Sequence, residues 1–245
     1  MSALLEIRDL SKRYGEVVVA DAVSLTLRRG ECLGVIGPNG AGKSSLFHLI
    51  AGTVAADAGS IRIDDRELIG LPAHARARLG VARAFQIPQP FSNLSVYENV
   101  LAAAMFAGAE RETAAERSAI DALARTGLTD RSEQLAGQLP LLDRKRLELA
   151  KALAAKPRVL LLDEVAGGLT EREVQIVVGL VRDLKADLAT VWIEHIPQAL
   201  QAVCDRIMVL HFGRKLLEAS PAETMNSAIV RDIYMGPKES DERAA

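Results

Sequence analysis

The chain has 245 residues, of which 49% are hydrophobic and 25% are charged, a composition typical of a soluble globular domain. Its formal net charge of −2 provides no basic face for nucleic acid, so we expect no nucleic-acid partner. The cysteines, Cys32 and Cys204, are too few for a disulfide framework, and their apolar neighbours predict buried thiols. The chain lacks a signal-like start and an apolar run near the ~20 residues that span a bilayer. We therefore expect a cytoplasmic protein that reaches a membrane through a partner.

The first part of the chain predicts strands around one helix. Residues 23–27 alternate apolar and polar side chains, as a half-buried strand does. Residues 32–36 form a short apolar run that stops at Gly37, which is typical of a fully buried strand. Residues 44–51 then predict a helix that ends at Gly52.

The middle of the chain predicts helices. Ser95 followed by Glu98 is a capping-box pattern, and it opens a predicted helix over 96–107. A second helix is predicted over 112–126, and few β-branched residues occur in this stretch. We therefore expect an inserted helical subdomain over about 87–155.

The last part of the chain alternates between helices and strands. Thr170 and Glu173 form another capping box, which opens a helix with one apolar face. The other predicted elements are a helix over 144–155 and strands over 159–162, 190–193, 207–211 and 215–218. This alternation predicts an α/β fold with a mainly parallel sheet between helical layers. We expect one domain over 1–237 and a disordered tail over 238–245.

A glycine-rich segment between the strand at 32–36 and the following helix matches G-x-x-x-x-G-K-[ST] at every defined position. Glycines let consecutive backbone N–H groups surround a phosphate, and the helix that follows adds its positive N-terminal end. Lys43 should contact the β- and γ-phosphates, and Ser44 should bind Mg²⁺. The alternative is a glycine-rich turn that happens to precede a helix. The residues expected to surround the nucleotide phosphates are Gly37, Pro38, Asn39, Gly40, Ala41, Gly42, Lys43, Ser44 and Ser45.

An acidic pair follows the buried strand at 159–162. Ligands of open α/β sheets bind at the carboxyl ends of the strands, where Asp163 would hold the Mg²⁺ ion. Glu164 could orient and polarise the attacking water. Such a pair found alone is more often a solvated strand end, but here a phosphate-binding loop lies upstream.

The order of these motifs over essentially the whole chain resembles the ATP-binding subunits of ABC transporters. The resemblance implies the P-loop NTPase fold of that family, with an N-terminal antiparallel β subdomain and an inserted α-helical subdomain. It also implies ATP hydrolysis with Mg²⁺. Tyr14, in Ser-Lys-Arg-Tyr-Gly, matches the aromatic residue that stacks on adenine. Gln86, in Arg-Ala-Phe-Gln, matches the glutamine that senses Mg²⁺ and water, and His195 matches the histidine that contacts the γ-phosphate.

Several segments look like the subunit that serves importers of branched-chain and related amino acids. The lipopolysaccharide-export ATPase is similar in some of these segments and is the main alternative. Importer membership implies transmembrane permease subunits, a periplasmic solute-binding protein, and a peripheral position on the cytoplasmic face of the inner membrane. The segments are 71–76, 82–86, 94–100, 220–223 and 233–236.

The segment over 139–143 departs from the family. The family has Leu-Ser-Gly-Gly-Gln there, which contacts ATP on the opposite subunit of a dimer, and this chain has Leu-Pro-Leu-Leu-Asp. Pro140 has no hydroxyl and no N–H, and Leu142 adds bulk. Asp143, if it capped the next helix, would repel a γ-phosphate. Together with Thr170 at a position that is usually Asp, these changes favour a heterodimer with a different ATPase subunit over a homodimer. The alternative is normal hydrolysis at both sites.

Two further functions remain to be considered. Non-transport ABC proteins of DNA repair or ribosomes would carry a second ATPase domain or a long heptad insertion, and the sequence shows neither. A non-hydrolysing regulator is disfavoured by Glu164 and His195, although the altered segment keeps it open. In the family, the membrane subunit docks beside the helical subdomain, and here we expect it to contact 86–97, with Phe91 and Leu94 among the apolar residues. These apolar residues could instead only pack the subdomain.

Overall fold

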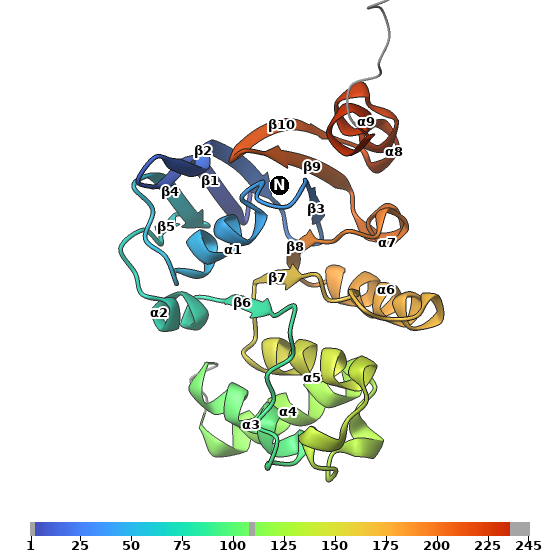
Figure 1. Ribbon diagram of the computed structural model, residues 1–245. Coiled ribbons are helices and arrows are strands. Elements are labelled where there is room, and N and C mark those ends of the chain that lie inside the picture. The colour runs from blue at the N-terminus through green and yellow to red at the C-terminus, as the bar shows by residue number, and fades with distance from the viewer. Residues whose placement is uncertain (1–2, 108–110, 236–245) are drawn as a thin grey trace, which may run out of the picture.

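The computed structural model describes residues 3–107 and 111–235, so the predicted tail over 238–245 lies outside the described residues. The elements form two sheets and a separate group of helices (Figure 1). This group of helices lies in the chain between β6 and β7. None of the helices within the described ranges is long and apolar enough to cross a membrane.

The larger sheet carries the strands that end near the glycine-rich loop. Its order is β10-β9-β3-β8-β7-β6, and all neighbours are parallel except the β9–β10 pair at one edge. The central strands are continuous apolar runs because helices cover them on both faces. The bounds are β3 Cys32–Ile36, β6 Val81–Ala84, β7 Val159–Asp163, β8 Ala189–Ile193, β9 Arg206–His211 and β10 Arg214–Ala219.

The smaller sheet is antiparallel and comes from the N-terminal part of the chain. Its order is β2-β1-β4-β5, and β1 is interrupted by register shifts against both neighbours. Helices α1, Lys43–Ala51, and α2, Ala73–Arg78, follow in the same part of the molecule. The strands are β1 Leu5–Tyr14, β2 Val17–Leu27, β4 Ala58–Ile63 and β5 Arg66–Glu67. This sheet and the larger one confirm the predicted fold class.

Three helices form a layer beyond the β6 end of the larger sheet (Figure 1). They are α3 Val96–Phe106, α4 Glu112–Thr126 and α5 Leu141–Ala154, and the short turns Thr129–Arg131 and Ala136–Gln138 lie between α4 and α5. The remaining helices are α6 Glu171–Lys185, α7 Pro197–Val203, α8 Pro221–Asn226 and α9 Ala228–Met235. Both predicted capping boxes, at Ser95 and Thr170, are present.

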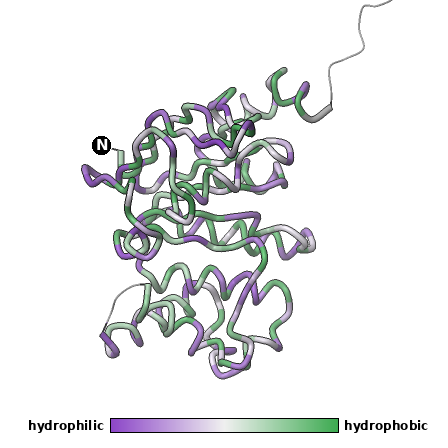
Figure 2. The backbone as a smooth tube through the Cα atoms, turned by 60° about the vertical axis from the view of Figure 1, so that its left-hand side comes forward, coloured by the Kyte–Doolittle hydropathy of each residue, from purple (hydrophilic) through white to green (hydrophobic). Residues whose placement is uncertain are grey.

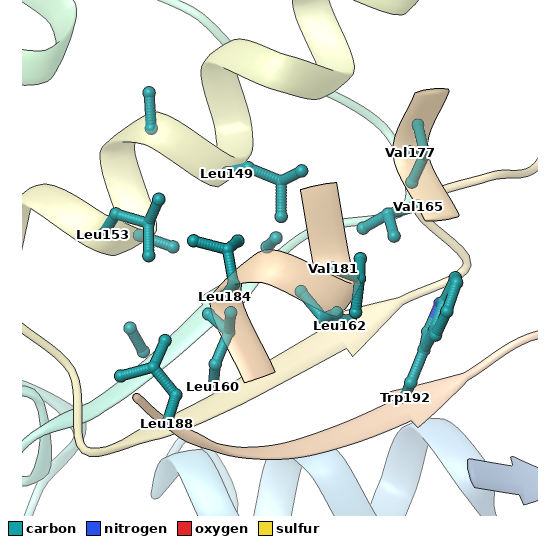
Figure 3. Packing of buried hydrophobic residues seen from close by; sticks show 14 of the residues in the cluster. Leu149, Leu153, Leu160, Leu162, Val165, Val177, Val181, Leu184, Leu188 and Trp192 are labelled. Atoms are coloured by element: carbon teal, nitrogen blue, oxygen red, sulfur yellow. The ribbon is translucent and has the colours of Figure 1, made fainter. Parts of the chain in front are cut away.

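One core cluster lies between the larger sheet and the helices α5 and α6, and a second lies between the larger sheet, the smaller sheet and α1. Hydrophobic and hydrophilic stretches alternate along the outer helices, as expected of amphipathic segments (Figure 2). Side chains of β7 and β8 meet the apolar face of α6 and residues of α5 (Figure 3). Fully buried examples in this cluster are Leu149, Leu160, Leu162, Val177, Val181 and Trp192. This packing fixes the strand ends that carry the candidate site.

Most predicted elements are confirmed, but two begin well before the expected residue: the strand predicted over 23–27 begins at Val17, and one helix also begins early. The strand at 32–36 and the helix at 112–126 have the predicted bounds. Helix α5 begins at Leu141 and not at 144, with Pro140 as its N-cap residue. Pro140 suits this place because proline at the start of a helix needs no N–H partner. Both cysteines are buried, with their Sγ atoms 3.5 Å apart.

Candidate functional site

The carboxyl edge of the larger sheet brings the predicted site residues together. Gly37 follows β3, Asp163 ends β7, His195 comes after β8, and Gln86 comes after β6. These strands are parallel neighbours in the order β3-β8-β7-β6, so their carboxyl ends meet at one edge.

The glycine-rich loop depends on backbone conformations that favour glycine. Gly40 has φ +79° and Gly42 has φ +98°, both in the left-handed region. A Cβ on Gly42 would collide with the carbonyl oxygen of Val19, and one on Gly37 would collide with that of Leu210. The loop is therefore enclosed by neighbouring backbone and leads directly into the N-terminus of α1.

Lys43 is the first residue of α1 and is 6% exposed. Its Nζ donates to the carbonyl oxygens of Gly37 at 2.6 Å and Pro38 at 3.0 Å. Burial lowers the pKa of Lys43, and the nearby carboxylates of Glu164 and Asp163 oppose this shift. The ammonium is thus held inside the loop by two carbonyl groups, where an anion would be a stronger partner.

The side chains predicted to bind Mg²⁺ are oxygen donors, which suit a hard cation. Ser44 is exposed at the start of α1, and Asp163 is buried at the end of β7. The carboxylate of Asp163 accepts a close hydrogen bond from Arg83 Nη2, so its charge is compensated. The Arg83 guanidinium lies 5.7 Å from the ring centroid of Phe47 and 5.0 Å from that of Phe85.

The described residues contain no cluster of three His, Cys, Asp or Glu side chains that could hold a metal by themselves. An Mg²⁺ ion at this edge would therefore depend on the phosphates of a nucleotide, as Mg²⁺ sites in phosphate-transfer proteins do. The residues present fit such an ion.

Glu164 is the centre of a hydrogen-bond network. Its Oε1 lies 2.7 Å from His195 Nε2, and its Oε2 accepts from Gln86 Nε2 at 2.5 Å. Its backbone has φ +45°, a conformation that non-glycine residues adopt rarely and at a cost. Its carbonyl oxygen accepts from Lys145 Nζ at 3.1 Å. The structure therefore brings together the glutamate, glutamine and histidine that the sequence placed in this site.

Glu194 lies beside this network, and sequence reasoning did not find it. Its Oε1 accepts from the backbone N–H of Ala166 at 2.8 Å, and its Oε2 accepts from that of His195 at 2.9 Å. Burial raises the pKa of Glu194, and the two backbone hydrogen bonds oppose that shift. Glu194 thus fixes the segment after β7 to the segment after β8.

Tyr14 lies at the end of β1 and is 52% exposed. Lys12 Nζ lies 5.3 Å from the centroid of its ring. An exposed ring on the small sheet has the surface that stacking on a base requires.

The departing segment at 139–143 begins α5. Leu139 is buried, and Leu141 is 44% exposed. Asp143 does not cap α5, contrary to the expectation, because it lies inside the first turn and its carboxylate pairs with Arg131 and Arg146, both at 3.1 Å. The repulsion that we expected between Asp143 and a γ-phosphate is therefore offset by these cations. Pro140 still offers neither a hydroxyl nor an N–H at the start of this helix.

A hollow of about 410 Å³ lies between α2, β6 and α5. Its lining includes Ala77, Phe85, Gln89 and Ala152. Phe91, which we expected to line a docking groove, is 59% exposed but is not among the residues that border this hollow.

Arg83 and Lys145 are further contributors that sequence reasoning missed. Arg83 lies two residues before Phe85 in a segment already singled out, and its position at the end of a strand was the available signal. Lys145 lies within a basic stretch, Arg144-Lys-Arg, which reads as a solvated helix face. Only the packing of α5 shows that Lys145 is buried.

The chain is similar in sequence to known ATP-binding proteins. A model of the ABC transporter family matches residues 20–167. The lipopolysaccharide export system ATP-binding protein LptB of Acidithiobacillus ferridurans is 34% identical over 240 residues, covering 96% of this chain and 98% of that protein. The high-affinity branched-chain amino acid transport ATP-binding protein LivG of Salmonella typhimurium is 34% identical over 249 residues, covering 95% and 98%.

Solved structures have the same fold. The ADP conformation of MJ1267, an ATP-binding cassette of an ABC transporter, superposes with a TM-score of 0.87 at 25% identity, covering 97% of this chain and all of that one. The cbiO1 protein of Clostridium perfringens, part of the ABC transporter complex cbiONQ, has a TM-score of 0.81 at 26% identity, with 96% of each chain covered.

Proposed function

Because this chain belongs to the ABC transporter family of ATP-binding proteins and hydrolyses ATP to power transport, we propose that it drives the import of branched-chain or related amino acids. The hydrolytic part of the proposal rests on one observation, the Glu164 carboxylate held by both Gln86 and His195. The import part rests on the likeness to LivG over nearly the whole chain.

In this proposal the loop over 37–45 binds the phosphates of ATP, and Tyr14 stacks on the adenine ring. Lys43 exchanges its bonds with Gly37 and Pro38 for bonds with phosphate oxygens. Ser44, Asp163 and the Gln86 side chain would hold Mg²⁺, which would supply positive charge beside the phosphates.

Glu164 is assigned as the residue that orients the attacking water and accepts its proton. The carboxylate is already positioned by Gln86 and His195 at 2.5 Å and 2.7 Å. His195 then contacts the γ-phosphate from the end of β8. A base fixed from two sides needs little rearrangement when ATP binds, which is the basis of efficient positioning.

The segment at 139–143 favours assembly with a different ATPase subunit. Pro140 supplies neither hydroxyl nor N–H, and Leu141 projects from the first turn of α5, where a partner's ATP would need close backbone approach. In a heterodimer, this chain would bind ATP through its own loop, and its partner would contribute a complete Leu-Ser-Gly-Gly-Gln segment to that ATP.

The remaining partners follow from the family, whose ATPase subunits work with transmembrane permease components. The hollow lined by Phe85 and Gln89 is the proposed contact with a permease segment, in place of Phe91. Phe85, which lines the hollow, directly precedes Gln86, so movement of the docked segment would reach the Glu164 network through this chain neighbour. A periplasmic solute-binding protein would deliver the solute, and this chain would lie at the cytoplasmic face of the inner membrane.

Export of lipopolysaccharide is the second candidate, because a LptB protein is as similar to this chain as LivG is. A strain that lacks this chain distinguishes the two. Loss of uptake of labelled leucine, isoleucine and valine, restored by the wild-type chain and not by Glu164→Gln, would support import. Normal uptake together with loss of lipopolysaccharide from the cell surface would replace it with export. Complementation by Glu164→Gln would point to a non-hydrolysing regulator.

A further inference from the structure

Lys145 is a buried lysine on α5 whose ammonium contacts the backbone of two site residues. The residue is 3% exposed, although the side chains on either side of it in the sequence are basic and less buried. Its Nζ donates to the carbonyl oxygen of Gln86 at 2.5 Å and to that of Glu164 at 3.1 Å. A single ammonium therefore joins the helical layer to the segments that follow β6 and β7.

These two carbonyl groups belong to residues whose side chains also bind each other. Gln86 Nε2 donates to Glu164 Oε2, so Lys145 closes a three-membered network from the backbone side. The carbonyl oxygen of Glu164 also accepts from the backbone N–H of Gly167 at 3.1 Å, which forms a turn directly after β7. Lys145 consequently fixes both the turn and the loop that present the glutamate and the glutamine.

The backbone of Glu164 needs such support. Its φ of +45° is sparsely populated for a residue with a Cβ, and surrounding contacts must hold it there. Its N–H donates to the carbonyl oxygen of Ile193 at 2.9 Å, so β8 holds the peptide group before the Glu164 Cα and Lys145 holds the peptide group after it.

The charges around Lys145 explain how an ammonium is tolerated in this position. Burial lowers its pKa, and the carboxylates of Glu194, Glu164, Asp163 and Glu148 oppose that shift. A buried cation is retained where acceptors and carboxylates surround it, whereas a hydrophobic side chain would leave the carbonyl groups without this donor.

We propose that Lys145 is a positioning residue for hydrolysis, which sets the backbone of Glu164 and Gln86 according to the placement of α5. This rests on the proposed function of Glu164. Helix α5 begins within the altered segment over 139–143. Lys145 therefore also links any contact made by that segment to Glu164. A rotation of the helical layer relative to the sheet would lengthen one or both of the Lys145 bonds and displace the carboxylate.

The test uses Lys145→Met in the full chain, because methionine keeps the length of the side chain and removes every donor. ATP affinity is expected to stay within about 2-fold, while turnover falls about 10-fold to 100-fold, the size of effect that a misplaced catalytic group produces. With MgATP bound, amide hydrogen exchange at Glu164 and Gly167 should become about 10-fold faster, because the turn that contains them loses a fixed point.

Matched variants separate positioning from general destabilisation. Lys145→Arg keeps a cation with donors and should recover most of the turnover and exchange protection. Lys185→Met is the control, because Lys185 on α6 likewise donates to a carbonyl oxygen, that of Val203 at 3.0 Å, but lies outside the site. It should leave turnover and exchange at Glu164 unchanged. If Lys145→Met does not fold, Lys145→Gln, which retains one amide donor group, replaces it in the same measurements.

The outcomes also separate this inference from the assignment of Glu164. Unchanged amide hydrogen exchange at Glu164 and Gly167 in Lys145→Met would overturn the positioning role. This readout does not depend on how fast the chain hydrolyses ATP. Loss of turnover in Glu164→Gln combined with normal turnover in Lys145→Met would overturn it too, while leaving the glutamate assignment intact. Normal turnover in Glu164→Gln would instead overturn the assignment of the base.

Discussion

The nucleotide edge of the larger sheet and the start of α5 differ in how they meet the requirements of ATP chemistry. At the sheet edge, glycines, a lysine, oxygen donors and a glutamate occupy the positions that phosphate binding and hydrolysis need. At the start of α5, Pro140 lacks a hydroxyl and an N–H, and Leu141 and Leu142 add bulk. The two regions lie in one chain, so the capacity to bind ATP and the capacity to complete another subunit's site can change independently.

The largest effect is expected at the sheet edge, from Glu164→Gln. Removing the proposed base should lower turnover by about 1,000-fold, within the range for a general base. ATP affinity should stay nearly constant, because the variant amide occupies the same volume. Radiolabelled phosphate release and equilibrium binding would measure the two quantities. Turnover that stays within a few-fold of wild type would mean that hydrolysis does not use this carboxylate.

Lys43→Met should weaken ATP binding by about 100-fold, since it removes a charge-assisted contact with the phosphates. The fold should persist because the hydrogen bonds of the lysine are to the carbonyl groups of Gly37 and Pro38, within its own loop. Titration with a fluorescent ATP analogue would give the affinity, with Lys185→Met as the control. Unaltered affinity would show that the loop holds its ligand by backbone groups alone.

Restoring the start of α5 tests the other half of the comparison. In a Glu164→Gln background, the chain should remain monomeric with MgATP, whereas Pro140→Ser with Leu141→Gly and Leu142→Gly should form a nucleotide-dependent dimer. The same three changes in the active chain should raise turnover about 10-fold, by adding donors at the transferred phosphate. Light scattering gives the mass. A nucleotide-dependent homodimer of the unaltered segment would instead show that Pro140 and Leu141 still engage ATP.

Asp143→Asn should have the smallest effect and be confined to stability. Its carboxylate pairs with Arg131 and Arg146 and is buried, so losing the charge should lower the free energy of unfolding by about 1–2 kcal/mol. ATP affinity should not change, because the contacts are internal to the helical layer. Urea unfolding provides the measurement, and a change in ATP affinity of more than a few-fold would reassign Asp143 to the nucleotide.

Sequence patterns within a few residues of each other predicted the buried strand, the helix starts and the phosphate loop. The apolar run of β3, the capping boxes at Ser95 and Thr170, and the glycine-rich loop all follow from neighbouring residues. The start of α5 was misjudged because Asp143 is a common N-cap residue, and its true partner Arg131 comes from a preceding turn.

The support of the site was harder to predict than its motif residues. The burial of Lys145 and the pairing of Arg83 with Asp163 depend on how α5 and β6 pack against β7. In sequence, Lys145 looks like an ordinary surface cation between two arginines, and Arg83 is a single cation between two alanines whose partner is not indicated. Contacts between segments far apart in the chain are set by tertiary packing, which no local pattern encodes.

Trp192 gives the molecule a built-in optical probe. It is the sole tryptophan of the chain, and it is fully buried on β8, where it pairs with Gly34 and Leu162. These neighbours precede the phosphate loop and Asp163 in their own strands, and the indole packs in the buried cluster beside Val177 and Val181 of α6 (Figure 3). Its emission therefore reports on the packing of the larger sheet against α6, so unfolding can be followed in the unlabelled protein.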